Sequence, residues 1–162
     1  MKLTGTLSDR DSWRATECSI DKAVGVVGTR SALLILREAF YGATRFDEFV
    51  RRVGISEAVA SARLRELTDA GIFVKVPYRE PGQRARYEYQ LTDAGRELLP
   101  VVLGLMQWGD RHLQSDGAPL RLRAEDGSPV RVEVRSASGD LLTGDDIAVS
   151  YARKRTPRPS SR

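Results

Sequence analysis

The fold is decided by residues 45–70, which read RFDEFVRRVGISEAVASARLRELTDA. Apolar side chains recur at helical spacing on both sides of a short connection that contains Gly54. A first helix is predicted over 45–52, and a second helix, capped by Ser56, is predicted to run to about Ala70. Two helices joined by a short turn with glycine are typical of the helix-turn-helix motif. The side chains predicted to face the core are Phe46, Phe49, Val50, Val59, Ala60, Leu64 and Leu67.

Two helices are predicted before this motif and a hairpin after it. Over residues 18–28 the apolar side chains recur at the spacing of one helical face. Residues 31–41 are more continuously apolar, so we expect a central, buried helix there. Residues 72–78 and 87–91 alternate between apolar and polar side chains, and a basic loop with a Pro-Gly turn separates them. These two segments predict a β-hairpin with a long basic tip.

The last predicted helix begins after Thr92 and runs to about Leu113, and Pro100 is expected to kink or interrupt it. Its apolar side chains lie on two stripes, so the helix needs two surfaces to pack against. One surface is its own domain, and we expect the other to be a second copy of the chain. The residues expected in this dimer interface are Ile20, Val24, Val101, Leu105, Met106 and Trp108.

The order of these elements predicts an α+β fold, a winged helix-turn-helix with an additional C-terminal dimerisation helix, over residues 18–114. The other expected parts are 1–17, a polar lead-in; 115–150, a small C-terminal β appendage; and 151–162, a basic, disordered tail. Alternation of apolar and polar residues predicts strands in the appendage at 120–125 and 130–135. One or two further short strands are expected between 141 and 149.

The net charge comes largely from one end of the chain. The chain has 162 residues, of which 41% are hydrophobic and 30% charged, an ordinary composition for a globular protein. Its formal net charge is +4, but five arginine and lysine residues lie after position 150, which leaves −1 for residues 1–150. Net charge therefore does not indicate a nucleic-acid-binding body, and any such case rests on local groups of arginines.

Several classes of protein are excluded by what the sequence lacks. No apolar run approaches the roughly 20 residues that a membrane-spanning helix needs, and the N-terminal residues do not form a secretory signal. Cys18 is the single cysteine, so the chain has no intrachain disulfide and no Cys-x-x-Cys metal site. His112 has no second ligand at metal-binding spacing, and no enzyme motif is present. We expect a cytoplasmic, non-enzymatic protein without membrane contact, cofactor or metal.

A set of short motifs is spread over residues 18–113. They are Arg45-Phe46, Gly54-Ile55-Ser56, Arg63-Leu64-Arg65-Glu66-Leu67, Gly71-Ile72, Tyr87-Glu88-Tyr89-Gln90-Leu91-Thr92 and Trp108-Gly109. In this order and spacing the chain resembles the HxlR-type bacterial transcriptional regulators. The resemblance implies a homodimeric DNA-binding regulator, often a repressor, that uses a recognition helix and a wing. The chain departs from the family at Ser19, where a proline is frequent, and at Ala58, where a basic residue is frequent.

A recognition helix reads base edges in the major groove with the side chains near its N-terminal end. In the second helix of the motif, these outward side chains offer hydroxyls, a carboxylate and methyl groups. Arg63 and Arg65 lie one turn further and can reach a phosphate or a guanine, although both can instead pair with acidic neighbours on the same helix. The predicted DNA contacts of this helix are Ser56, Glu57, Ala58, Ser61, Arg63 and Arg65.

Phosphate contacts are predicted at two further places. Arg45 begins the first helix of the motif, where the DNA backbone passes, with a solvated cap as the alternative. The tip of the hairpin is basic, and basic wings bind phosphates or enter the minor groove. The wing residues predicted to contact DNA are Arg79, Gln83, Arg84 and Arg86.

Cys18 stands at the start of the first predicted helix, where the helix dipole favours the thiolate and increases its reactivity. In some HxlR-type regulators the matching cysteine senses oxidants or electrophiles. Since the chain has no second cysteine, the available products are an intersubunit disulfide or a small-molecule adduct. A half-buried apolar role for the thiol is the alternative.

Together these features predict a homodimeric, sequence-specific DNA-binding transcriptional regulator, a repressor acting on a near-palindromic operator. Response to redox or electrophile stress, or to a small-molecule effector, is a further expectation. The alternative function is a protein-interaction adaptor whose winged helix has lost DNA recognition. Ala58 and the near-neutral body favour the adaptor, whereas the arginines of the second helix and the wing favour DNA.

Overall fold

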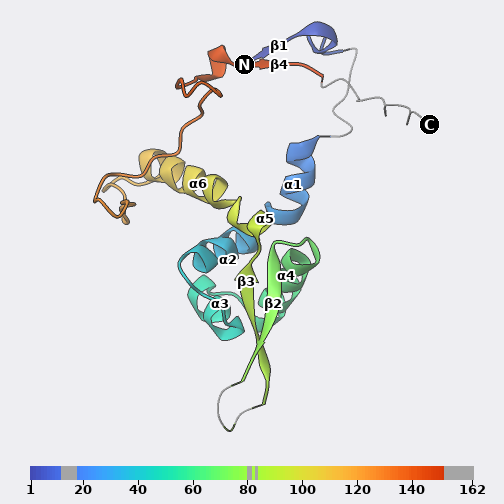
Figure 1. The fold of residues 1–162 in the computed structure, drawn as a ribbon, viewed down its shortest axis with the longest axis vertical. Coiled ribbons are helices and arrows are strands. Elements are labelled where there is room, and N and C mark those ends of the chain that lie inside the picture. Colours follow the sequence, from blue (N-terminus) through green and yellow to red (C-terminus); the bar gives the residue numbers. More distant parts are fainter. Residues whose placement is uncertain (12–17, 80–81, 83, 152–162) are drawn as a thin grey trace, which may run out of the picture. The chain divides into compact units, whose positions relative to one another are not determined.

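The computed structural model describes residues 1–11, 18–79, 82 and 84–151 (Figure 1). Its chain divides into two compact units. Residues 18–132 form one, which we call the helix-turn-helix unit, and residues 1–17 with 133–162 form the other, the terminal unit. The sequence placed a boundary after residue 114, whereas the structure groups residues 115–132 with the helices.

Four helices build the helix-turn-helix unit around α2. They are α1 (Ser19–Val27), α2 (Arg30–Phe40), α3 (Phe46–Val53) and α4 (Glu57–Asp69). α2 packs against the other three, and its Ile35 and Leu36 have no exposed surface. Thr29 caps α2, because its side-chain oxygen accepts a hydrogen bond from Ala32 N at 3.2 Å. The prediction of a central, buried helix is therefore confirmed.

The turn between α3 and α4 has the form that the sequence predicted. Gly54 follows α3 with φ +69°, a left-handed conformation that residues with a side chain disfavour. Ser56 then caps α4, and its Oγ accepts a hydrogen bond from Val59 N at 3.3 Å. Both helices of the predicted motif are present.

The partly buried carboxylate of Glu48 caps the start of α3. Glu48 accepts hydrogen bonds from the backbone N–H groups of Thr44 and Arg45, each at 3.1 Å. The bond from Arg45 and then the bond from Thr44 hold the pKa of Glu48 below its ordinary value, and the charges of Arg52 and Arg51 lower this pKa further. Glu48 therefore satisfies two backbone donors that the beginning of a helix leaves without partners.

Three aromatic rings join the helices to the hairpin. Phe49 of α3 packs edge-to-face on Phe73, with ring centroids 6.1 Å apart, and on Tyr89, with centroids 6.3 Å apart. Phe73 and Tyr89 complete the triangle at 6.4 Å. Such pairs contribute about 0.5–1.5 kcal/mol each beyond the burial of their surface. Leu64 and Leu67 of α4 belong to the same buried core.

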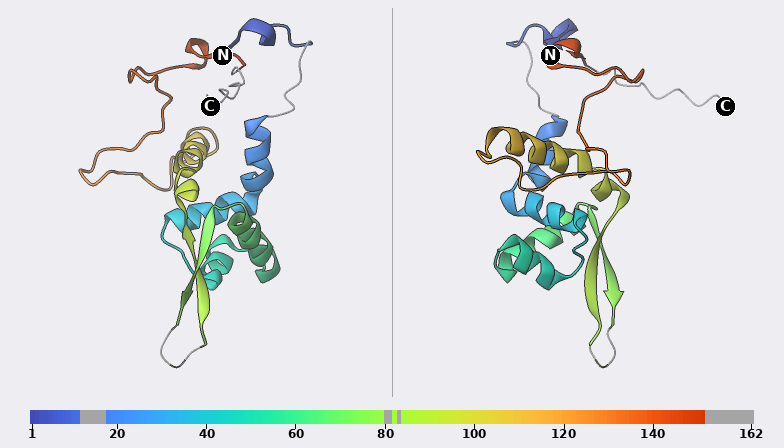
Figure 2. Two further views of the ribbon diagram at one scale, coloured as in Figure 1. Left: turned by 45° about the vertical axis from the view of Figure 1, so that its right-hand side comes forward. Right: turned by 90° about the vertical axis from the view of Figure 1, so that its left-hand side faces the viewer.

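The wing is an antiparallel hairpin of two strands, as predicted. They are β2 (Phe73–Tyr78) and β3 (Arg86–Leu91). The hairpin pairs Phe73 with Leu91 at its base and extends away from the helices of its unit (Figure 2). Tyr89 N donates a hydrogen bond to Thr44 O at 2.7 Å, which ties the base of the hairpin to the connection between α2 and α3.

The helix predicted over 92–113 is divided in two. Its parts are α5 (Asp93–Arg96) and α6 (Leu99–His112). Pro100 lies in the first turn of α6, where its missing N–H loses no helical hydrogen bond, so the interruption falls just before the proline. α5 runs close to the wing, since a Cβ at Gly95 would lie 2.3 Å from Ile72 O. α6, all of which the structure describes, contains no fully buried residue.

Residues 113–132 follow α6 without the strands that the sequence predicted at 120–125 and 130–135. Within this described segment, one isolated bridge joins Arg123 to Pro129. The two segments meet through the backbone, where Val130 N donates to Leu122 O at 3.1 Å, and Val130 and Val132 are also bound by a side chain of α6. Gln107 Nε2 donates to Val130 O, and Gln107 Oε1 accepts from Val132 N, each at 3.0 Å.

The terminal unit contains a short parallel pairing between segments far apart in the sequence. β1 (Lys2–Leu3) pairs with β4 (Ala148–Val149), so one of the short strands expected between 141 and 149 is present. Residues expected as a lead-in thus contribute a strand. Nearby, the carboxylate of Asp146 accepts a hydrogen bond from Thr143 N at 2.7 Å. The predicted tail lies outside the described residues from position 152 onward.

We expect Glu48→Gln to destabilise the chain by about 1 kcal/mol, because a charged acceptor of two backbone N–H groups becomes a neutral one. The measurement is the free energy of unfolding in urea at pH 7. Since the pKa of Glu48 is lowered on folding, its contribution is complete at neutral pH. It disappears as the pH falls from the unfolded value, about 4.3, through the lowered folded value.

The matched control for this prediction is Asp47→Asn, in the same turn. Asp47 is exposed, and its ion pair with Arg51 is 3.8 Å long. This variant should change the free energy of unfolding by less than about 0.5 kcal/mol. Equal stability of Glu48→Gln and the unaltered chain at pH 7 would contradict the capping role.

Candidate nucleic-acid interface

The first turns of α4 present small and polar side chains to solvent. The core face of this helix is formed by Ala60, Leu64 and Leu67, all fully buried. The predicted contact residues that are exposed are Ser56, Glu57, Ala58, Ser61 and Arg65. A helix with such an outer face can approach the floor of a major groove closely and offer it hydrogen-bonding groups.

Val59 does not face the core as the sequence predicted. It is 42% exposed, because it lies one residue, or about 100° of helical rotation, from the buried Ala60. The prediction was wrong because it took the apolar residue type as the guide and not the angle around the helix. Val59 therefore adds a branched aliphatic group to the exposed surface near the start of α4.

Arg63 is bound by its own helix. Its guanidinium forms an ion pair with Glu66, and its side chain is only 21% exposed. Its Nε atom is buried and has no hydrogen-bond partner among the described residues. This ion pair is the alternative that the sequence left open. Arg65, two residues after Arg63 on α4, is exposed and makes no ion pair within the described part of the chain.

Arg45 joins the start of α3 to the wing. Its guanidinium carbon lies 4.8 Å from the centre of the Tyr78 ring on β2, which is a cation–π contact. The backbone of Arg45 also forms an isolated antiparallel bridge with Glu88 on β3. Because Arg45 is exposed, its charge remains at the surface where the motif meets the wing.

The hairpin carries a row of exposed cations. The predicted wing residues Arg79, Arg84 and Arg86 are exposed, and Gln83 lies outside the described residues. Lys75 on β2 adds a cation that sequence reasoning missed, and its Nζ lies 5.7 Å from the centre of the Tyr89 ring. The alternation of side chains along β2 was the signal that could have found it.

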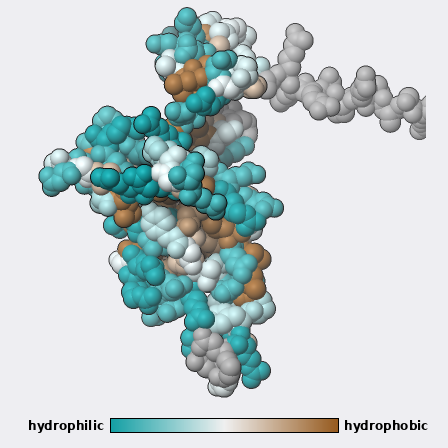
Figure 3. Space-filling model, turned by 60° about the vertical axis from the view of Figure 1, so that its left-hand side comes forward, coloured by the Kyte–Doolittle hydropathy of each residue, from teal (hydrophilic) through white to brown (hydrophobic). Residues whose placement is uncertain are grey.

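Apolar side chains of α1 and α6 are exposed in the helix-turn-helix unit. Five of the six residues predicted for a dimer interface are among them: Ile20, Val24, Val101, Leu105 and Trp108. On the face drawn in Figure 3, hydrophobic side chains reach the surface of this unit between hydrophilic ones. Met106 differs, because it faces α2 and its Sδ accepts a hydrogen bond from the Tyr41 hydroxyl at 3.8 Å.

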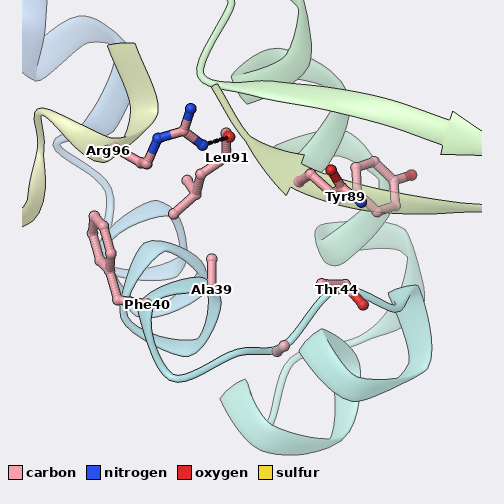
Figure 4. A pocket seen from close by; sticks show the side chains of 8 residues that line it. Ala39, Phe40, Thr44, Tyr89, Leu91 and Arg96 are labelled. Carbon is pink, nitrogen blue, oxygen red and sulfur yellow. Dashed lines mark hydrogen bonds between the residues drawn. The ribbon is translucent and has the colours of Figure 1, made fainter. Parts of the chain in front are cut away.

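A hollow of about 300 Å³ lies behind the base of the wing (Figure 4). Figure 4 shows Arg96 and Leu91 on one side of it and Phe40 and Ala39 of α2 on the other. Arg96 donates a hydrogen bond to Leu91 O at 2.5 Å and pairs with Asp93. The hydrogen bond of Arg96 connects α5 to the base of the wing. Because Arg96 is already bound, the hollow offers little charge to a ligand.

Cys18 is the N-cap residue of α1, as the sequence predicted, and it is partly buried. Its carbonyl oxygen accepts a hydrogen bond from Lys22 N at 3.1 Å.

Among the described residues, no three His, Cys, Asp or Glu side chains are grouped as metal ligands. In the same part of the chain, no helix has the length and apolar character needed to cross a membrane.

Residues 26–117 match the HxlR-like helix-turn-helix family, and the chain therefore belongs to this family of transcription regulators. It is similar to Rv3095 of Mycobacterium tuberculosis, an uncharacterized HTH-type transcriptional regulator, with 46% identity over 106 residues. That match covers 65% of this chain and 66% of the relative, slightly less than two thirds of its length. An uncharacterized HTH-type transcriptional regulator of Methanothermobacter thermautotrophicus is 33% identical over 93 residues, 57% of this chain and 70% of the relative.

Solved structures confirm the fold class. The chain is similar to PA1607, a candidate transcription factor, with a TM-score of 0.74 and 36% identity over 86% of this chain and 97% of that one. It is also similar to the redox regulator HypR in its oxidized form, with a TM-score of 0.54 and 30% identity over 59% of this chain and 97% of that one. The α+β winged helix-turn-helix prediction is confirmed.

Proposed function

We propose that this chain is a homodimeric, sequence-specific DNA-binding repressor. The observation that carries the proposal is the exposed, small and polar face of α4 beside a hairpin lined with exposed arginines. A helix of this kind lies in the major groove, and a dimer holds two of them one helical turn, about 34 Å, apart. The operator is then a near-palindromic site that repeats the symmetry of the dimer.

Base readout is assigned to the N-terminal end of α4. The hydroxyls of Ser56 and Ser61 serve either donor or acceptor base edges, and the Ser56 oxygen that caps α4 still leaves its hydrogen to donate. Glu57 accepts from the amino group of cytosine, and the methyl of Ala58 contacts the methyl of thymine. Arg65, one turn further, reaches a guanine or a phosphate.

Phosphate binding is assigned to the arginines around the motif. The exposed ones are Arg45, Arg79, Arg84 and Arg86. Such contacts fix the position of the protein on the duplex and supply affinity that carries no sequence information. Arg63 joins them if it exchanges Glu66 for a phosphate, and a contact by Gln83 stays a prediction. The adaptor alternative is favoured by this internal pairing, by Ala58 and by the near-neutral body of the chain.

Dimerisation is assigned to the apolar faces of α1 and α6. Val101, Leu105 and Trp108 follow one another at intervals of four and three residues, so they form one stripe along α6. Full burial of a side chain of this size contributes about 1.5–3 kcal/mol, and these three, already half-buried, gain about half of that each when a second copy covers them. A twofold dimer covers the same stripe on both copies, which removes a contiguous apolar surface from water.

A redox role is assigned to Cys18, because the chain is similar to HypR, a redox regulator. Two Cys18 thiols, one from each copy, form a disulfide by giving two electrons and two protons to a quinone, which becomes the hydroquinone. A quinone adduct on a single thiol is the other product.

We expect the operator affinity of the unaltered chain to change on treatment with benzoquinone, and that of Cys18→Ser to stay the same. An equal response of both proteins would reject the redox role of Cys18.

We expect Arg84→Ala to weaken binding to promoter and random duplexes alike, because it removes a phosphate contact. The slope of log affinity against log salt should flatten by about one unit for the lost contact. The protein is titrated onto a fragment of its own promoter, and onto a random duplex of equal length, at several salt concentrations. Arg121→Ala, an exposed arginine after α6, is the matched control and should leave the slope unchanged.

Two outcomes of this titration would count against the proposal. An unchanged slope for Arg84→Ala would remove the wing from the interface. Binding by the unaltered chain that ignores salt, or that does not prefer the promoter to the random duplex, would favour the adaptor instead.

We expect Val101→Glu to shift the chain from dimer to monomer, because it places a charge in the apolar stripe of α6. The measurement is the molar mass in solution by sedimentation equilibrium. Val134→Glu is the matched control, since Val134 is 56% exposed, Val101 is 49% exposed, and Val134 lies outside α6. A dimer that persists in Val101→Glu, or an unaltered chain that is monomeric, would reject this interface.

A further inference from the structure

A second pocket lies between α2 and α6. Its volume is about 610 Å³, which is within the range of small-molecule sites in proteins. One wall belongs to α2 and the opposite wall to α6, two helices that pack against each other. Pro119 and Leu120, from the segment that follows α6, form a third wall. The pocket therefore lies within one unit of one chain.

The segment that supplies the third wall is fastened to α6. Gln107 binds the backbone at Val130 and Val132 through two hydrogen bonds of 3.0 Å each. A Cβ at Gly104 would lie 3.8 Å from Val132 Cγ1, so the segment runs close along the helix. The end of the segment that supplies the third wall, at residues 130 and 132, is therefore held against α6.

The inside of the pocket is mainly apolar. Leu33 and Leu34 line it from α2, and Val102, Leu105 and Met106 line it from α6. An aromatic ring or a short aliphatic chain gains free energy by leaving water for such a surface.

Charged side chains line the same pocket. Arg30 and Arg37 lie two helical turns apart on α2, and Asp110 lies on α6. Glu38 accepts hydrogen bonds from Arg37 Nε at 2.9 Å and Nη2 at 2.6 Å, which orients this guanidinium and leaves Nη1 for another acceptor. Arg30 makes no ion pair with any residue that the structure describes. The lining thus offers an uncommitted cation and an oriented one.

We infer that this pocket binds a small apolar carboxylate. Its ring or chain lies between the leucines of α2 and the side chains of α6, and its carboxylate binds Arg30 or the Nη1 group of Arg37. Guanidinium and carboxylate form strong, charge-assisted hydrogen bonds, whereas a neutral ligand leaves the exposed guanidinium of Arg30 to water. Asp110 accepts a hydrogen bond from a hydroxyl or amino group of the ligand and disfavours a second negative charge.

The position of the pocket connects it to DNA affinity, a step that rests on the proposed function. α2 packs on α4, and α6 carries the apolar stripe assigned to the dimer interface. A ligand between α2 and α6 changes how these helices pack, and with it the separation of the two α4 helices. By thermodynamic linkage, the ligand changes operator affinity by the same factor as the operator changes ligand affinity.

Calorimetric titration of the full chain with 1-naphthoate tests the binding. 1-Naphthylmethanol and 1-naphthylmethylamine carry the same ring with a neutral and a cationic group. We expect the affinity to fall in the order carboxylate, alcohol, amine. Arg30→Gln should weaken 1-naphthoate about tenfold and leave the alcohol unchanged. Arg111→Gln, an exposed arginine of α6 that does not line the pocket, is the matched control and should change neither.

The location of the probe is tested without any substitution. The chain has two methionines, Met1 in the terminal unit and Met106 in the pocket, so methyl-labelled methionine gives two NMR signals. 1-Naphthoate should shift the Met106 signal and leave that of Met1 in place. Shifts of both signals, of Met1 alone or of neither would overturn the inference, as would a cationic probe that binds most tightly.

Two further outcomes separate this inference from the proposed function. Binding of 1-naphthoate by Val101→Glu but not by the unaltered chain would mean that the second copy fills the pocket, and would reject the inference. Operator binding without 1-naphthoate binding would likewise reject the inference alone. Binding of 1-naphthoate by a chain that does not prefer its promoter would support the pocket and reject the proposed function.

Discussion

The edge-to-face packing of Phe49, Phe73 and Tyr89 holds together the parts on which function depends. The three rings come from α3, β2 and β3, so one contact triangle fixes the wing against the helix-turn-helix motif. α4 buries Leu64 and Leu67 in the same core and thereby turns its small, polar side outward. Without this core, the exposed face of α4 and the cations of the wing would have no fixed relation to each other.

Charge in this chain acts through its local placement. Residues 1–150 sum to −1, yet the described arginines of the wing are all exposed, and Arg45 lies where the wing meets the motif. Arg63 contributes less, because Glu66 neutralises it within α4. Arg30 is placed differently again, exposed in the lining of a mainly apolar pocket away from the wing. The same residue type therefore lies exposed on the wing, in an internal ion pair and in the lining of a candidate ligand site.

Features determined by neighbouring residues could be predicted from the sequence. Gly54 and Ser56 mark the turn and the start of α4, and alternation marks the hairpin. Features that depend on distant residues could not be predicted. Gln107 binds the backbone at Val130 and Val132, more than twenty residues away, and β1 pairs with β4 across nearly the whole chain. The pocket was missed for the same reason, since its walls come from three separate segments. Val59 was misplaced because residue type was weighed above helical angle.

In the proposed complex, two copies of the chain hold their α4 helices against one duplex. Its most direct test is the distance between two spin labels, one at Asp69→Cys on each copy, in a Cys18→Ser background bound to the promoter fragment. Double electron–electron resonance should give one narrow distribution on the order of the helical repeat of DNA, about 34 Å. The absence of dipolar coupling between labels on DNA-bound protein would contradict the account.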